Sequence, residues 1–231
     1  MQEARATFVV RMWLPDRPGA LGQVASRIGA VRGEIVGIEI LERGAGRAID
    51  ELAVELPDER LVDLLVQEVQ EVDGVDVEEV RLAAEAVHDP RLDALEAAAV
   101  LVGATTTEEL LDALLAHAGR VLGAQWCTVV DLEQETVVTS RGPTPEPAWL
   151  AAFVEGSRSS ARVAAGEAGP DDVVWAPLPS SSLALILGRD HLGYRARERR
   201  QVAALARIVD TRVRELNKAA ALRSHPSSSH R

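Results

Sequence analysis

The chain has 231 residues, of which 47% are hydrophobic and 26% charged, so it can build a packed core in one large domain or two small ones. Its 36 acidic residues outnumber its 25 lysines and arginines, and the net charge of −11 argues against nucleic-acid binding, because phosphates require cationic partners. The single cysteine, Cys127, excludes an internal disulfide and a cysteine-rich zinc site. Because no apolar run approaches the ~20 residues of a membrane-spanning helix and the N-terminus lacks a secretory pattern, we expect a cytoplasmic protein without membrane contact.

The first 82 residues predict two helices and four strands in the order β-α-β-β-α-β. Apolar residues alternate in four segments, and the apolar spacing becomes helical from Ala20 onward and again after Pro57. In the second strand we expect Val36, Ile38 and Ile40 to share one face. The predicted strands are 7–14, 35–41, 48–56 and 75–82. This order predicts a ferredoxin-like α+β fold, with an antiparallel sheet that carries both helices on one face.

The second half begins at a polar junction, and we place the domain boundary near residues 84–90. An apolar stripe of Leu92, Leu95, Ala99 and Val102 predicts a helix with this side turned inward. Thr105 or Thr106 with Glu108 or Glu109 is typical of a capping box at the start of the next helix. The following elements are strands 125–131 and 135–140, a short helix around Trp149 to Phe153, strands 172–178 and 182–189, and a helix over 194–217. Residues 219–231 are expected to form a disordered tail.

The most informative short motif is DRPGAL, residues 16–21, at the first strand-to-helix junction. Pro18 favours the backbone angles of a first helical turn, and Asp16 is placed to cap the helix. The first backbone amides of a helix have no partner within it and attract anions, including a ligand carboxylate. Gly19 permits a ligand to approach the backbone closely. On spacing alone, a plain turn that binds nothing remains the alternative.

Residues 14–42, LPDRPGALGQVASRIGAVRGEIVGIEILE, resemble the start of an ACT domain, a regulatory module that binds amino acids. The resemblance extends over residues 7–82 and implies a homodimer with an effector at its interface. There the effector meets the first β-α turn and the start of the second strand. Members that bind effectors often have Asn or Asp early in that strand, where this chain has Ile35. The ligand-binding residues implied by the resemblance are Asp16, Arg17, Pro18, Gly19, Ala20, Leu21, Ile35 and Val36.

The second half resembles a GAF domain, through residues 175–210 and the order of its elements. This resemblance implies 1–86 as the ACT domain and 90–218 as a GAF-like domain with an antiparallel sheet and flanking helices. It also implies a small-molecule pocket beneath 141–172, or dimerisation through the flanking helices. Four aromatic residues are candidates to line a pocket, although core positions are the commoner role for such side chains: Trp126, Trp149, Phe153 and Trp175.

The remaining polar residues do not form a catalytic set in the sequence. Cys127 lies inside a predicted strand, where a buried thiol is expected, and His117 is expected on a helix surface. The five histidines lack metal-ligand spacing, and the adjacent carboxylate pairs point apart on a strand or helix. The arginines at 195, 197, 199 and 200 predict a solvated face or a contact with an acidic partner. We therefore expect no enzyme activity, no metal and no cofactor.

Two hypotheses about function follow from the sequence. The first is a non-catalytic regulatory protein that binds an amino acid or another small effector and rearranges as a dimer. A partner enzyme would respond to this rearrangement. The second is a dimerisation scaffold without a ligand, for a metabolic enzyme or another partner, which Ile35 favours.

Overall fold

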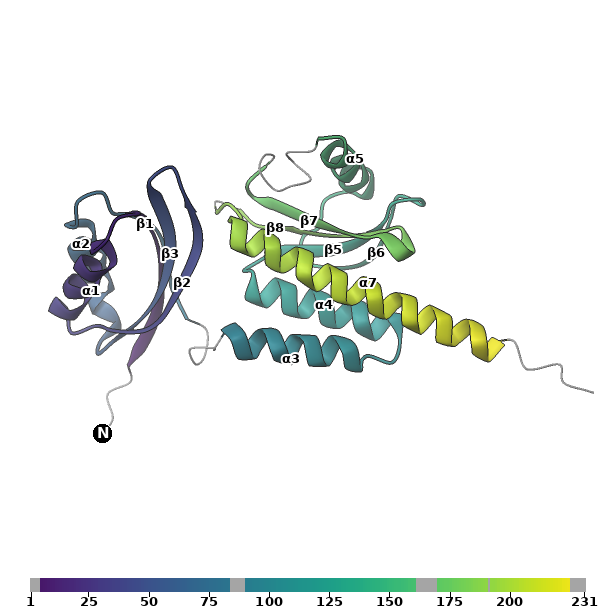
Figure 1. Cartoon of the computed structure of the whole chain (residues 1–231), viewed down its shortest axis with the longest axis horizontal. Coiled ribbons are helices and arrows are strands. Elements are labelled where there is room, and N and C mark those ends of the chain that lie inside the picture. Colours follow the sequence, from purple (N-terminus) through teal and green to yellow (C-terminus); the bar gives the residue numbers. More distant parts are fainter. Residues whose placement is uncertain (1–4, 84–89, 161–169, 191, 225–231) are drawn as a thin grey trace, which may run out of the picture. The chain divides into compact units, whose positions relative to one another are not determined.

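The computed structural model describes residues 5–83, 90–160, 170–190 and 192–224. The chain divides into two compact units, Met1–Asp89 and Pro90–Arg231, and each is described by itself. The described residues form two antiparallel four-stranded sheets and six α-helices (Figure 1). None of these helices has the length and apolar character needed to cross a bilayer.

The first unit has the predicted β-α-β-β-α-β order. Its sheet has the strand order β2-β3-β1-β4, with antiparallel neighbours throughout, and both helices lie on one face (Figure 1). The ferredoxin-like fold predicted for this half is therefore confirmed. Its elements are β1 (Ala6–Pro15), α1 (Ala20–Ala30), β2 (Glu34–Gly44), β3 (Arg47–Leu56), α2 (Val62–Gln70) and β4 (Asp76–Leu82).

The core of the first unit lies between the sheet and the two helices. Alternate residues of β1, among them Val10 and Met12, are buried on this face and pack with Val24 of α1 and Leu65 of α2. Side chains alternate between the faces of a strand, so this period of two fixes which face of β1 meets the helices. One charged residue interrupts the apolar set, because Asp50 of β3 pairs in register with Met12 and is 4% exposed.

The edge strand β2 is less covered than the centre of the sheet. Ile38 and Ile40 stand opposite Leu52 and Asp50 of β3, which places both isoleucines on the helix-bearing face. They are nevertheless 49% and 39% exposed. Val36 falls at a register shift between Ile35 and Gly37, so the predicted common face holds for the two isoleucines only.

The second unit is also built on an antiparallel sheet, with the order β6-β5-β8-β7. Its larger core joins one face of the sheet to α4 and α7, and a smaller core joins the other face to α5. The predicted sheet and flanking helices are present, and the GAF-like assignment remains a prediction. The elements are α3 (Pro90–Gly103), α4 (Thr107–Val121), β5 (Trp126–Asp131), β6 (Thr136–Arg141), α5 (Pro147–Arg158), β7 (Val173–Leu178), β8 (Leu183–Gly188) and α7 (Ala196–Ser224).

Local polar contacts fix the start of α4 and join α7 to its neighbours. The Thr106 side chain accepts a hydrogen bond from the Glu109 amide at 3.1 Å, and the Glu109 carboxylate accepts one from the Thr105 amide at 2.8 Å, which confirms the capping box. At the start of α7, the buried Arg189 guanidinium donates to both carboxylate oxygens of Glu198, at 2.8 and 2.9 Å. Arg189 also donates to the Leu122 carbonyl at 2.9 Å, so this cation joins the ends of β8, α4 and α7.

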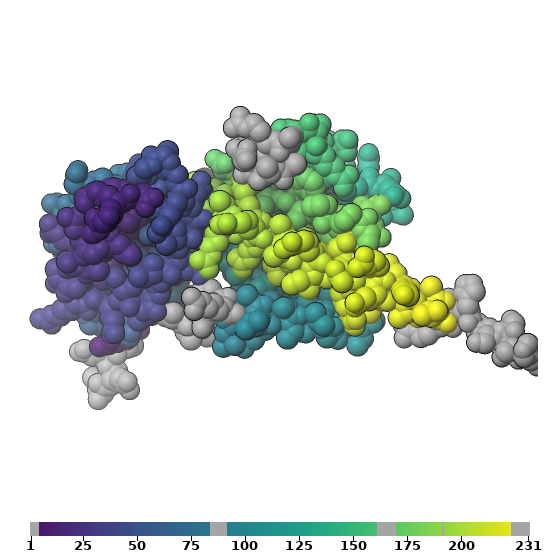
Figure 2. All heavy atoms as spheres, in the orientation of Figure 1, coloured from purple at the N-terminus to yellow at the C-terminus, as the bar shows by residue number. Residues whose placement is uncertain are grey.

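Two sequence predictions for the second unit are wrong. The stripe of Leu92, Leu95, Ala99 and Val102 faces outward, and α3 instead buries Ala97 and Leu101. Helix α3 carries apolar residues on both sides, so the spacing of these residues did not show which side faces the core. Helix α7 continues to Ser224, so residues 219–224 are helical, and the rest of the expected tail lies outside the described residues. Helices α3 and α7 lie side by side on the surface (Figure 2).

Candidate functional site

The corner between β1 and α1 holds the first six predicted site residues. The Asp16 amide donates to the Gly46 carbonyl at 2.9 Å, which ties the corner to the β2–β3 hairpin. Gly19 is the N-cap of α1 and has φ +89°, in the left-handed region that glycine adopts without strain. No heavy atom beyond its chain neighbours lies within 4 Å of the position that a Cβ would take there. The corner is therefore open on the side that Gly19 presents.

Several amides at this corner are free to bind a ligand. The Ala20 and Gln23 amides donate to the Arg17 and Gly19 carbonyls, at 3.3 and 3.0 Å. The amides of Gly19, Leu21 and Gly22 donate no hydrogen bond to any described residue. No side chain caps α1 and its first turn carries no acid, so the predicted Asp16 cap is wrong. Free amides and the helix dipole together favour an anion at this position.

The last two predicted site residues lie far from this corner within one chain. Ile35 stands opposite Val54 and packs against the core, whereas the corner end of β2 is Gly44, opposite Arg47. Val54 and Arg47 are seven residues apart along β3, which corresponds to roughly 25 Å of strand. Ile35 and Val36 can therefore meet a ligand at the corner only if they come from a second copy.

Asp50 is a candidate residue that the sequence analysis missed. Its Oδ1 atom is buried without a hydrogen-bond partner among the described residues. Burial raises the pKa of the Asp50 carboxyl; the positive charge of Arg43 opposes this and the negative charge of Asp16 adds to it. Arg43 and Asp16 both lie at the end of the first unit that holds the corner between β1 and α1. The signal in the sequence was an acid at an inward position of strand 48–56, where the residues two before and two after it are apolar.

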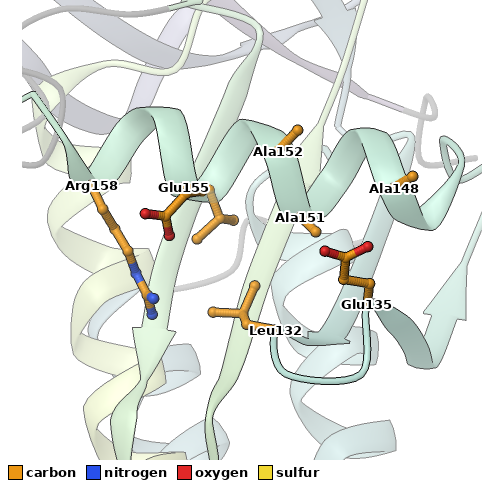
Figure 3. Close-up of a pocket in the computed structure, with 8 residues that line it drawn as sticks. Leu132, Glu135, Ala148, Ala151, Ala152, Glu155 and Arg158 are labelled. Carbon is orange, nitrogen blue, oxygen red and sulfur yellow. The ribbon is translucent and has the colours of Figure 1, made fainter.

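The second unit has a shallow pocket of about 280 Å³ between α5 and the β5–β6 turn (Figure 3). Glu155 and Arg158 reach it from α5, while Leu132 and Glu135 reach it from the turn. Its volume is just below the roughly 300–1,000 Å³ typical of ligand pockets. None of the four candidate aromatics lines it. Trp126, Phe153 and Trp175 pack against the smaller core, and Trp149 stacks on Phe153 with ring centroids 5.5 Å apart.

The other candidate side chains are buried or hydrogen-bonded within the fold, as side chains with a structural role are. Cys127 is buried as predicted, its Sγ lies 3.4 Å from the Leu115 carbonyl, and burial raises the pKa of the thiol. The prediction for His117 is wrong, because this residue is only 7% exposed on the inner side of α4. Arg199, expected on a solvated face, donates to the Tyr194 carbonyl at 3.2 Å. Within the described part of the chain, no group of three or more His, Cys, Asp or Glu could hold a metal ion.

Comparisons with known proteins add similarities of low identity. No family model and no curated protein matches the chain. The crystal structure of the ACT domain from the GTP pyrophosphokinase of Chlorobium tepidum is 18% identical and covers 35% of this chain and 100% of its own, with a TM-score of 0.29. The NMR structure of the same domain is 19% identical, with 39% and 97% coverage and a TM-score of 0.29. An unknown protein from Galdieria sulphuraria is 13% identical over 94% of this chain and 95% of its own, with a TM-score of 0.35.

Proposed function

We propose that this chain is a non-catalytic regulatory protein whose first unit binds an amino acid at the α1 corner, between two copies of the chain. The observation that carries the proposal is the open corner at Gly19, with free amides at Gly19, Leu21 and Gly22. These amides suit a ligand carboxylate. The resemblance of residues 7–82 to ACT domains supports an amino acid as the ligand.

The edge strand β2 supports the second copy in this proposal. It has one unpaired side, and Val36, Ile38 and Ile40 expose apolar surface along it. An antiparallel pairing of two β2 strands centred on Glu39 would bring the partner's Ile35 opposite Arg43. This register closes the gap of roughly 25 Å and completes the predicted site from two copies.

The second unit offers another surface for self-association. The outward stripe of α3 includes Leu92, Leu95 and Val102, all more than half exposed. Their spacing of three and seven residues repeats along one side of the helix, as in helices that pair. We propose that the GAF-like unit contributes this stripe to the dimer.

Regulation follows from binding linkage in this proposal. An effector that binds one arrangement of the dimer more tightly shifts the population toward it, and a coupling of about 1–3 kcal/mol is enough for control. A partner enzyme would detect the change. If neither unit binds a ligand, the same two surfaces support the alternative function, a dimerisation scaffold.

The test is titration of the full chain with each of the twenty L-amino acids, followed by thermal unfolding. A ligand stabilises the folded state by RT ln(1 + [L]/Kd), so a binder at 100 times its Kd adds about 2.7 kcal/mol to the unfolding free energy. Gly19→Val fills the open corner, and we expect it to abolish the heat of binding while the first unit stays folded.

Gly123→Val is the matched control, because Gly123 also has a positive φ and open space but lies in the second unit. We expect this control to cost stability without changing the calorimetric titration. Unchanged titration of Gly19→Val would exclude the corner as the site. No binding of any amino acid at millimolar concentration would favour the scaffold.

A further inference from the structure

We propose that Asp50 is the residue that receives the ammonium group of the bound amino acid, while the amides of α1 receive its carboxylate. This inference rests on the proposed function and assigns the second half of the ligand to a residue of β3. It makes the site selective for a zwitterion over a simple carboxylic acid.

The position of Asp50 supports this role. It lies on the helix-bearing face, between Met12 of β1 and Ile40 of β2 in the pairing of the three strands. Met12 and the end of β1 at Pro15 are three residues apart, or about 10 Å along the strand. Helix α1 begins just past this end and packs back over the same face through Ala20 and Val24. Asp50 thus lies on the face that α1 covers, within reach of the charge of Asp16 at the corner.

The chemistry of Asp50 points to a cationic partner. Its 4% exposure is in the range of core side chains, and its Oδ1 atom has no hydrogen-bond partner among the described residues. Buried carboxyl groups are normally paired, since an unpaired buried charge is costly. An ammonium group would supply both hydrogen bonds and charge to this carboxylate.

The strand next to Asp50 is partly open to solvent. Only one strand separates it from the open edge of the sheet, and the side chain beside it on that strand, Ile40, is 39% exposed. The charged groups that act on Asp50 are Arg43 from β2 and Asp16 from the corner. Two acids and one arginine thus act at this position, and their net negative charge favours a ligand cation near Asp50.

This assignment also replaces the polar partner missing from β2. Ile35 is aliphatic and packs against the core, so it offers no acceptor to a ligand amine. Asp50 supplies one from β3, beside the corner of the same copy. The groups that bind the two charges of the ligand, the free amides of α1 and the Asp50 carboxylate, then come from one chain. The second copy covers the bound ligand.

The experiment compares amino acids with their 2-hydroxy counterparts by calorimetry on the full chain. For each amino acid that binds, the probe is its matching 2-hydroxy acid, such as L-lactate for L-alanine or L-phenyllactate for L-phenylalanine. We expect the wild type to bind the hydroxy acid at least about tenfold more weakly, because the charge-assisted hydrogen bond is lost. We expect Asp50→Asn to weaken amino-acid binding by a similar factor and to leave hydroxy-acid binding nearly unchanged.

Asp63→Asn is the matched control, because Asp63 is an exposed acid in α2, at the end of the sheet opposite the corner. We expect this control to bind as the wild type does, and Asp50→Asn to melt as a folded protein. Equal affinity of the wild type for amino and hydroxy acids would overturn the role of Asp50 without any variant. Full affinity in Asp50→Asn would also overturn it while the proposed function stands, whereas failure of the wild type to bind any amino acid would overturn both.

Discussion

At the scale of single residues, each unit buries an ionisable side chain, Asp50 in the first and His117 in the second. The two side chains change the stability of the fold in opposite directions as the pH falls. Burial lowers the pKa of His117 from its usual value of 6.5, with Arg120 acting in the same direction and Asp93 on α3 against it. The unfolded chain therefore binds more protons than the folded one as the pH falls below 6.5, and stability is lost. Asp50 acts in the opposite sense, because its raised pKa makes the folded state the better proton acceptor.

We predict that His117→Leu flattens the pH dependence of the second unit. Leucine has no proton to gain, so the variant should be more stable than the wild type at pH 5.5, with a smaller difference at pH 8. Urea unfolding followed by circular dichroism at both pH values measures this difference. An equal difference at the two pH values would show that His117 does not carry the linkage.

At the scale of elements, the period of the apolar residues predicted most of the fold, and packing decided the rest. Alternation placed β1 within a residue of both observed ends, and the helical spacing placed the start of α1 at Ala20. Helix α3 carries apolar residues on both sides, so its stripe of Leu92 and Leu95 was assigned to the wrong side. The role of Ile35 also depended on register, which a single strand does not reveal.

We predict different outcomes for one charge placed on each of two helices. Val209 of α7 is fully buried, so Val209→Asp should cost about 3 kcal/mol or more and unfold the second unit. Leu95 of α3 is 69% exposed, so Leu95→Asp should leave the melting temperature unchanged and weaken self-association. Sedimentation velocity and thermal unfolding of both variants provide the measurements. Wild-type association of Leu95→Asp would remove the α3 stripe from the dimer surface.

At the scale of the whole molecule, the full set of predicted site residues can meet only in an assembly. One chain supplies the α1 corner and Asp50, whereas the predicted contacts at Ile35 and Val36 lie at the other end of the same sheet. The order of elements was readable from the sequence, but this separation follows from strand pairing. The buried Asp50 was likewise hidden, because an acid in an alternating strand is usually assigned to the wet face.

We predict that a bound amino acid protects two separate segments from hydrogen exchange. One is the corner at 16–22, through ligand contact, and the other is β2, through pairing of its free edge with a second copy. Amides of α4 and β8 in the second unit should exchange at the same rate with and without ligand. Protection of the corner alone would mean that the ligand binds to one copy without joining β2 strands.

The free edge of β2 also has a consequence for solubility. A strand with unpaired peptide groups and exposed isoleucines is a template on which further chains can stack into fibrils. In a parallel stack, the glutamates at 34, 39 and 42 would each lie beside their own copies and repel them, whereas the antiparallel pair brings only Glu39 opposite itself. Neutralising these side chains would remove that repulsion, so the same strand that admits one partner would then recruit many.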